Sequence, residues 1–148
     1  AMHGILPFSR VEEFKTKIDA LYSRYAEKME QYKIVKASMF TTIATNAFLF
    51  EPVFYCEDSR AAFIDRHTDP DVLKSIKTFE PNIEGRKVVA EMKQGIIDCV
   101  YECGGIHMQI GKAYPYTRER DAGAIAMVRS LKSHVDPKGL MNPGALGL

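Results

Sequence analysis

The chain has 148 residues, a formal net charge of +1, 46% apolar residues and 26% charged residues, which is the composition of an ordinary globular domain. Because the two signs of charge are interspersed, the composition favours neither nucleic acid nor an anionic membrane surface as a partner. No apolar run approaches the roughly eighteen residues that a membrane-spanning helix needs, so the sequence predicts no membrane span.

Three cysteines, Cys56, Cys99 and Cys103, lack the spacing of a disulfide framework, which favours a reducing compartment such as the cytoplasm. Cys99 and Cys103 lie close enough along the chain to share a metal, but zinc needs four ligands and no further pair of ligands stands nearby. We interpret both as small packing residues of a helix and expect no metal site.

The first predicted element is an amphipathic helix over about residues 10–32, because apolar residues recur every three or four positions from Val11 to Met29. Ser9 and Glu12 have the spacing of a capping box, which predicts where the helix begins.

Residues 34–55 are rich in β-branched and aromatic types and predict two strands, about 34–41 and 47–55, with a turn near 44–46. Pro52 cannot donate a hydrogen bond to a neighbouring strand, so the second strand should be an edge at that point or carry a bulge.

The middle of the chain predicts a polar connection over residues 56–68 and then two helices. Asp69 and Pro70 open a short helix to about residue 79, since proline is favoured at the first helical position. The second helix runs from about residue 83 to 103 and should stop at the Gly104-Gly105 pair. Its apolar stripe contains Val88, Val89, Met92, Ile96, Val100 and Cys103.

The last part predicts a strand over residues 106–110, whose alternation directs Ile106, Met108 and Ile110 to one face and His107 and Gln109 to the other. A final helix should then run to about Val135.

Thr117 is the candidate cap of this final helix, and Glu119 in its first turn would suit the helix dipole. Residues 1–148 are therefore expected to form one α+β domain, an antiparallel sheet flanked by helices and ferredoxin-like, with residues 136–148 as a return segment.

The sequence contains no dinucleotide-binding, phosphate-loop, serine-elbow or zinc-protease motif. His107 is the strongest isolated candidate, because Gln109, Lys112, Tyr114 and Tyr116 follow it and such groups could bind a polar substrate and move a proton. The alternative is the solvated outer face of a sheet. The two tyrosines could likewise line a pocket or cover the core as a lid.

The end of the chain, LKSHVDPKGLMNPG, resembles the C-terminus of FAD-linked oxidases of the vanillyl-alcohol oxidase and D-lactate dehydrogenase-like superfamily. In that superfamily a last helix runs into Asp-Pro-x-Gly, two apolar residues and Asn-Pro-Gly. The start, GILP followed by a helix from Val11, is similar to the entry to the family's cap domain. The Gly-Gly turn and the strand ending in Ile110-Gly111-Lys112 lie where the family has its active-site strand.

The resemblance implies a cap domain with its C-terminal return, separated from the N-terminal FAD-binding domain and inactive in isolation. The parent would oxidise an alcohol, a 2-hydroxy acid or a phenolic alcohol by hydride transfer to FAD. The implied partners are a small-molecule substrate and the FAD-binding domain of the same parent chain. A second copy of the chain and an electron-accepting protein are further candidates.

The resemblance also implies roles for individual residues. The hydroxy-acid branch reads Glu-His-Gly-(Ile/Val)-Gly, and its glutamate helps to hold a metal; this chain has no acidic residue there, so no metal is expected. The phenol-oxidising branch has a Tyr-Arg pair, which Tyr116-Thr117-Arg118 resembles with one residue between. The expected site contains His107 as the catalytic residue, Gln109, Tyr114, Tyr116 and Arg118 as substrate contacts, and Asn142 at the flavin.

A second hypothesis from another class remains open at this point. A ferredoxin-like module could instead stand alone, binding a small ligand or pairing through its sheet without catalysis.

Overall fold

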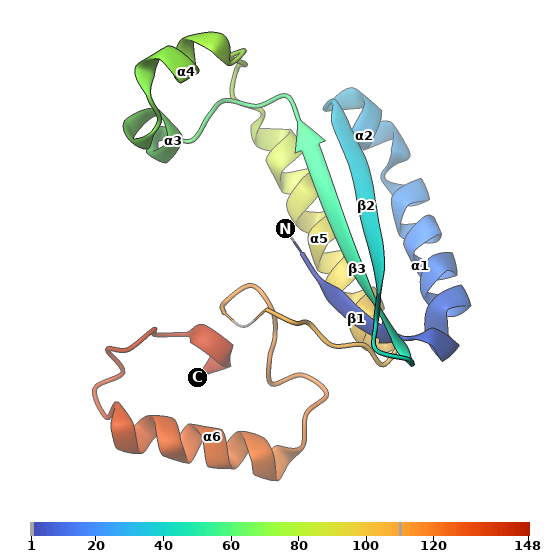
Figure 1. Cartoon of the computed structure of the whole chain (residues 1–148), viewed down its shortest axis with the longest axis vertical. Helices are drawn as coiled ribbons and strands as arrows, with labels where there is room; N and C mark the ends of the chain where they lie inside the picture. The colour runs from blue at the N-terminus through green and yellow to red at the C-terminus, as the bar shows by residue number, and fades with distance from the viewer. Residues whose placement is uncertain (1, 110) are drawn as a thin grey trace.

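The computed structural model describes residues 2–109 and 111–148 and confirms the predicted α+β class (Figure 1). In chain order its elements are β1 (Gly4–Pro7), the 3-10 turn η1 (Phe8–Arg10), α1 (Val11–Arg24), α2 (Ala26–Gln31), β2 (Ile34–Ile43), β3 (Ala47–Cys56), α3 (Ala62–His67), α4 (Pro70–Ser75), α5 (Ile83–Glu102), α6 (Ala122–Val135) and the 3-10 turn η2 (Ala145–Gly147).

The three strands form one antiparallel sheet in the order β1-β3-β2. Beyond β1, Ile106 pairs with Ile5 in a single antiparallel bridge. With this bridge in the place of a fourth strand, the chain follows the β-α-β-β-α-β order of a ferredoxin-like fold. The predicted strand 106–110 is therefore wrong for residues 107–109, which do not pair, and Ile110 lies outside the described residues.

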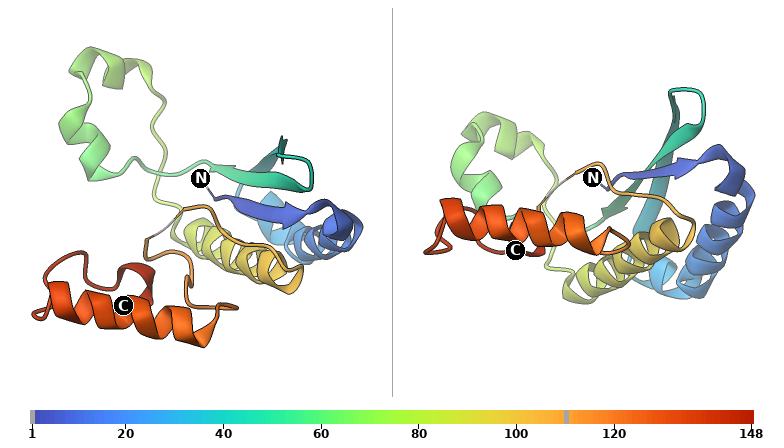
Figure 2. Two further views of the ribbon diagram at one scale, coloured as in Figure 1. Left: turned by 60° about the horizontal axis from the view of Figure 1, so that its bottom comes forward. Right: turned by 90° about the horizontal axis from the view of Figure 1, so that it is seen from below.

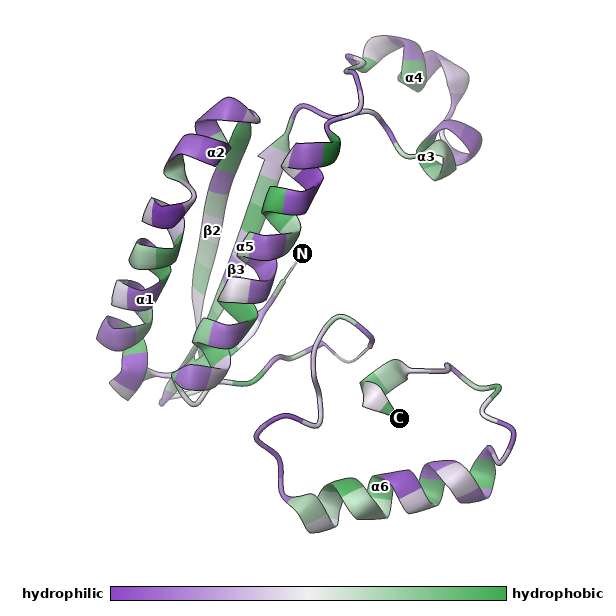
Figure 3. Ribbon diagram, turned by 180° about the vertical axis from the view of Figure 1, so that it is seen from behind, coloured by the Kyte–Doolittle hydropathy of each residue, from purple (hydrophilic) through white to green (hydrophobic). Residues whose placement is uncertain are grey.

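Helices α1, α2 and α5 lie on one face of the sheet, and Figure 2 shows no helix over the opposite face. The buried residues of α1 and α5 are apolar and pack in the core with those of the sheet, and Figure 3 shows hydrophobic and hydrophilic residues alternating along both helices. Even-numbered strand residues such as Leu6 and Phe50 point to the helices and pack with Phe14, Met92 and Val100 in the core. Odd-numbered strand residues therefore point to the helix-free side.

The first helix begins where the sequence predicted, but it is interrupted at Tyr25, which separates α1 from α2. The predicted capping box is absent. Ser9 lies inside η1, Arg10 occupies the cap position of α1, and no side chain makes a cap hydrogen bond there.

The predicted hairpin is confirmed within two residues at each end, with Ile43 opposite Ala47. Pro52 lies on the central strand, yet the prediction of an edge at that point is confirmed, because the pairing of β1 with β3 ends at Phe50. Backbone groups of alternate residues point to the same side, so the nitrogen of Pro52 faces the open side where no donor is needed.

The connection after β3 contains helix α3, which the sequence did not predict, and α4 ends at Ser75, earlier than expected. Helix α5 is confirmed, with Asn82 as its cap and Gly104 at a φ of 68° just beyond its end. Cys99 and Cys103 are buried in the core, which confirms their packing role.

Helix α6 ends at Val135 as predicted, but Thr117 does not cap it. The helix begins at Ala122, where the side chain of Asp121 accepts a hydrogen bond from the Ala124 amide. Both residues are acceptable caps by type, so the sequence alone did not separate them. Glu119 lies in the preceding turn at a φ of 58°.

Candidate functional site

The outer edge of β1 is closed by one backbone bridge and by two side chains. Ile5 and Ile106 exchange backbone hydrogen bonds of 2.8 and 2.9 Å. The next outward-facing residue, His3, donates its amide to the Tyr114 hydroxyl at 3.3 Å and accepts from His107 Nδ1 at 2.7 Å. Since a carbonyl can only accept, His107 carries its proton on Nδ1. Two side chains thus replace the backbone of a fourth strand.

The ring of His107 is 8% exposed and lies among aromatic side chains. Tyr114 stacks on it with 4.2 Å between centroids and 15° between planes, and Tyr101 of α5 meets it edge-on at 5.2 Å. Burial lowers the pKa of His107, and the backbone oxygens of His3 and Ile97 oppose this only in part. Its Nε2 makes no well-aligned hydrogen bond within the described residues.

Residues 106–108 alternate between buried and exposed, but the buried position is that of the polar residue, and Gln109 does not share it. His107 lies inside the protein, whereas Ile106 and Met108 are 46% and 51% exposed. The ring packs against Tyr101 and Tyr114 and donates to the His3 carbonyl, and these contacts hold His107 inside the protein. The solvated-face alternative for His107 is therefore wrong as well.

The loop that follows is tied to α5. The Tyr101 hydroxyl donates to the Pro115 carbonyl at 3.1 Å, and Arg118 bonds Asp98 at 2.5 Å while its guanidinium lies 4.9 Å from the Tyr101 ring centre. Tyr114 belongs to the buried core cluster, so it packs on the core as the lid alternative describes.

The structure does not bring all the expected substrate contacts together. The Tyr116 ring is covered by Arg120, 4.6 Å from its centre, while Arg118 points to Asp98. Gln109 is exposed. The Tyr-x-Arg sequence therefore does not form a side-chain pair in the chain as described here.

The tail folds around one carboxylate. Asp136 is buried, and its two oxygens accept from the amides of Leu140 and Met141, each at 2.9 Å, and from the Lys132 ammonium. Lys132 first, and then these amides, hold the pKa of Asp136 below its ordinary value. The turn that results leads into Asn142 at a φ of 45°.

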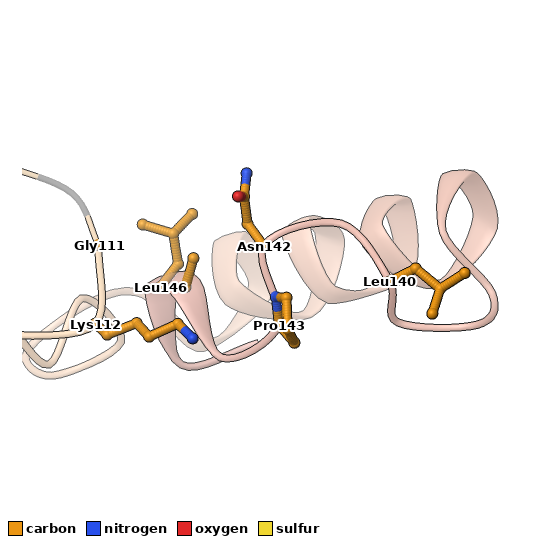
Figure 4. Close-up of a pocket in the computed structure, with 7 residues that line it drawn as sticks. Gly111, Lys112, Leu140, Asn142, Pro143 and Leu146 are labelled. Atoms are coloured by element: carbon orange, nitrogen blue, oxygen red, sulfur yellow. The ribbon is translucent and has the colours of Figure 1, made fainter.

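The same turn returns the tail to the loop after His107. The Leu146 amide donates to the Gly111 carbonyl at 2.9 Å. Between the two segments lies a hollow of about 700 Å³ lined by Gly111, Lys112, Leu140, Asn142, Pro143, Ala145 and Leu146 (Figure 4). It combines one amine and one amide with apolar walls, a combination that can contact the polar edge of a planar ring.

A further polar pair, His3 and Glu51, was not found from the sequence. His3 Nε2 lies 3.1 Å from Glu51 Oε2, with side-chain exposures of 12% and 20%. The register of β1 and β3, extended by one pair beyond Gly4 and Phe50, places the two residues opposite each other on the helix-free side. Recognition of the four-residue strand β1 would have revealed the pair through its alternation.

Within residues 2–109 and 111–148, no three His, Cys, Asp or Glu side chains gather in a way that could hold a metal ion. In the same part of the chain no helix has both the length and the apolar character needed to cross a membrane.

Comparison with known proteins finds one family model that matches part of the chain. Residues 86–146 match the family model described as FAD linked oxidases, C-terminal domain. No curated protein and no solved structure matches the chain. The matched stretch contains most of α5, the loop with His107 and Tyr114, α6 and the tail, and it confirms the resemblance seen in the sequence without specifying a branch of the superfamily.

Proposed function

Because residues 86–146 match the C-terminal domain of FAD linked oxidases, we propose that the chain is the substrate-covering part of an FAD-dependent oxidoreductase. The reaction is the oxidation of an alcohol, phenolic alcohols included, or of a 2-hydroxy acid, with hydride transfer to the flavin. FAD is held mainly by a separate domain of the parent chain, so this part alone is inactive. The observation that carries the proposal is the Asp136-centred turn, which places Asn142 beside Gly111 and Lys112.

The residues around this hollow suit one edge of a flavin. Asn142 offers both a donor and an acceptor, and Lys112 offers a positive charge, the kind of group by which proteins tune a flavin ring. Pro143 and Leu146 supply apolar surface for the ring itself. When bound, FAD supplies the hydride acceptor; the chain supplies contact, orientation and exclusion of water.

The helix-free side of the sheet is the proposed substrate side. His107 acts there through His3, whose carbonyl it holds, rather than by direct contact, since its own ring is buried. Among the other expected contacts, the exposed Gln109 and the partly exposed Tyr116 are the ones free to meet a substrate.

The test is expression of the parent gene with the coding sequence that precedes residue 1. We expect a yellow protein that retains FAD through gel filtration and whose flavin is bleached by an alcohol or hydroxy-acid substrate. Asn142→Ala should weaken FAD retention, whereas Asn46→Ala, in the distant hairpin turn, should leave it unchanged. A parent protein that stays colourless with FAD present would contradict the proposal and favour a ligand-binding module.

A further inference from the structure

The side of the sheet without helices is an almost uncharged surface with one acidic group. We call it the helix-free face. It consists of His3, Ile5 and Pro7, of Val35, Ala37, Met39, Thr41 and Ile43, and of Ala47, Leu49, Glu51, Val53 and Tyr55. This set contains no lysine and no arginine. Several of its apolar members are largely exposed, among them Val35, Met39 and Tyr55.

Glu51 is the only carboxylate on this face and is held by His3. The carboxylate makes no other hydrogen bond among the described residues, so one oxygen remains available to a ligand. His3 is itself fixed through its backbone by Tyr114 and His107. Its other ring nitrogen, Nδ1, is buried and has no partner in the described part of the chain.

The charge of the pair excludes one class of ligand. With a neutral imidazole the pair carries one negative charge, and with a protonated imidazole it carries none. In neither state does the helix-free face carry a net positive charge that could offset a bound carboxylate. A hydroxyl group, in contrast, can donate to Glu51 while the hydrocarbon part of the same molecule contacts the neighbouring apolar side chains.

We propose that the helix-free face binds the substrate, and that this substrate is an apolar alcohol and not a 2-hydroxy acid. Glu51 accepts a hydrogen bond from the alcohol hydroxyl. His3 is a positioning residue for Glu51, and His107 and Tyr114 position His3. This inference rests on the proposed function and narrows its substrate class.

The test uses the chain itself and two matched probes. Benzyl alcohol and mandelate share the aromatic ring and the hydroxyl, and mandelate adds a carboxylate at the same carbon. In an isotope-labelled chain, benzyl alcohol should shift the NMR signals of the Glu51 carboxyl and the His3 imidazole in a saturable manner. Mandelate should bind at least about tenfold more weakly, because its charge is not compensated.

Two variants sharpen the comparison. Glu51→Gln replaces the charged carboxylate with a neutral amide whose oxygen can still accept a hydrogen bond, and should reduce the difference between the two probes to about twofold or less. Glu57→Gln, a change just beyond β3 on an exposed side chain, should leave the difference as it is in the unmodified chain. The comparison of the two probes on the unmodified chain needs no variant, so a folding defect in Glu51→Gln does not remove the test.

Equal or tighter binding of mandelate, or no saturable shift with either probe, would overturn the inference. FAD retention by the parent tests the proposed function separately. A parent that retains FAD but prefers the carboxylate probe would contradict this inference alone. A colourless parent whose helix-free face still prefers benzyl alcohol would contradict the proposed function alone.

Discussion

The rings of His107 and Tyr114 lie face to face, 4.2 Å apart, and both side chains reach the backbone of His3 at the other end of the chain. The pair thereby links the loop after α5 to the first strand of the sheet. Because the described residues after α5 make a single bridge to β1, at Ile106, these side chains protect the rest of that edge. They also fix the residue that meets Glu51 on the helix-free face.

The pH dependence of stability should reveal the buried His107. Burial lowers its pKa below the ordinary value of 6.5, so over that interval the unfolded chain binds a proton that the folded chain does not. The stability that neutral His107 contributes to the fold is therefore complete above about pH 6.5. It is lost as the pH falls toward the pKa of His107 in the folded state. Urea unfolding at about pH 7.5 and 5.5 measures this loss, and His107→Phe should make it smaller.

An unchanged pH dependence in His107→Phe would show that His107 does not titrate in a buried site. His134→Phe is the matched control, because His134 is exposed on the last turn of α6. Asp58 does not interfere: Arg86 and the Asn82 amide lower its pKa to about 2, so its contribution is lost only in strong acid.

Removal of the Tyr114 hydroxyl should cost stability without loss of the aromatic stack. Tyr114→Phe leaves the His3 amide without its acceptor, for which we expect a decrease of about 1 kcal/mol in the free energy of unfolding. Tyr116→Phe should have almost no effect, since no hydrogen bond to the Tyr116 hydroxyl occurs among the described residues. Equal effects of the two changes in urea unfolding would argue against the edge-closing role of Tyr114.

Asp136→Ala should release the tail while the rest of the fold persists. The change removes the acceptor for the Leu140 and Met141 amides and the partner of Lys132. We expect amide hydrogen exchange at these two residues to accelerate about tenfold or more, with exchange in α5 unchanged.

Asp121→Ala serves as the control for Asp136→Ala. It removes the cap at the other end of α6 and should loosen only the first turn of that helix. Protection of Leu140 and Met141 that survives Asp136→Ala would show that another contact holds the turn.

Gly105→Ala should disturb the junction between α5 and β1. An added Cβ would lie 2.8 Å from the Ile5 carbonyl oxygen and 2.9 Å from Val100 Cγ1, so the backbone itself must shift. A destabilisation of about 1 to 3 kcal/mol follows from such overpacking. Gly111→Ala, where no atom lies within 4 Å of the added Cβ, is the control for thermal unfolding and should be nearly neutral. A neutral Gly105→Ala would contradict the close approach.

The sequence predicted the elements whose pattern is long. Helix α5 has an apolar stripe over five turns and a Gly-Gly stop, and the hairpin has two ten-residue strands, so both were found with nearly correct bounds. Helix α6 was found at its end but not at its start, because Thr117 and Asp121 are both suitable caps. Strand β1 was missed because its four residues are too few to display alternation.

In the candidate site, too, the sequence predicted the local contacts and not those between distant parts of the chain. The turn in the tail is made by local hydrogen bonds, since Asp136 accepts from amides only four and five residues ahead. The sequence therefore determined both this turn and the family resemblance of the tail. The direction of His107 and the pairing of His3 with Glu51 depend on contacts more than forty residues apart along the chain. Local alternation did not predict that His107 lies inside and Ile106 and Met108 outside, because it contains no information on which surfaces are already covered. The tertiary structure decided it, since the imidazole packs between two tyrosines and donates to the His3 carbonyl, a hydrogen bond that an isoleucine or methionine side chain cannot donate.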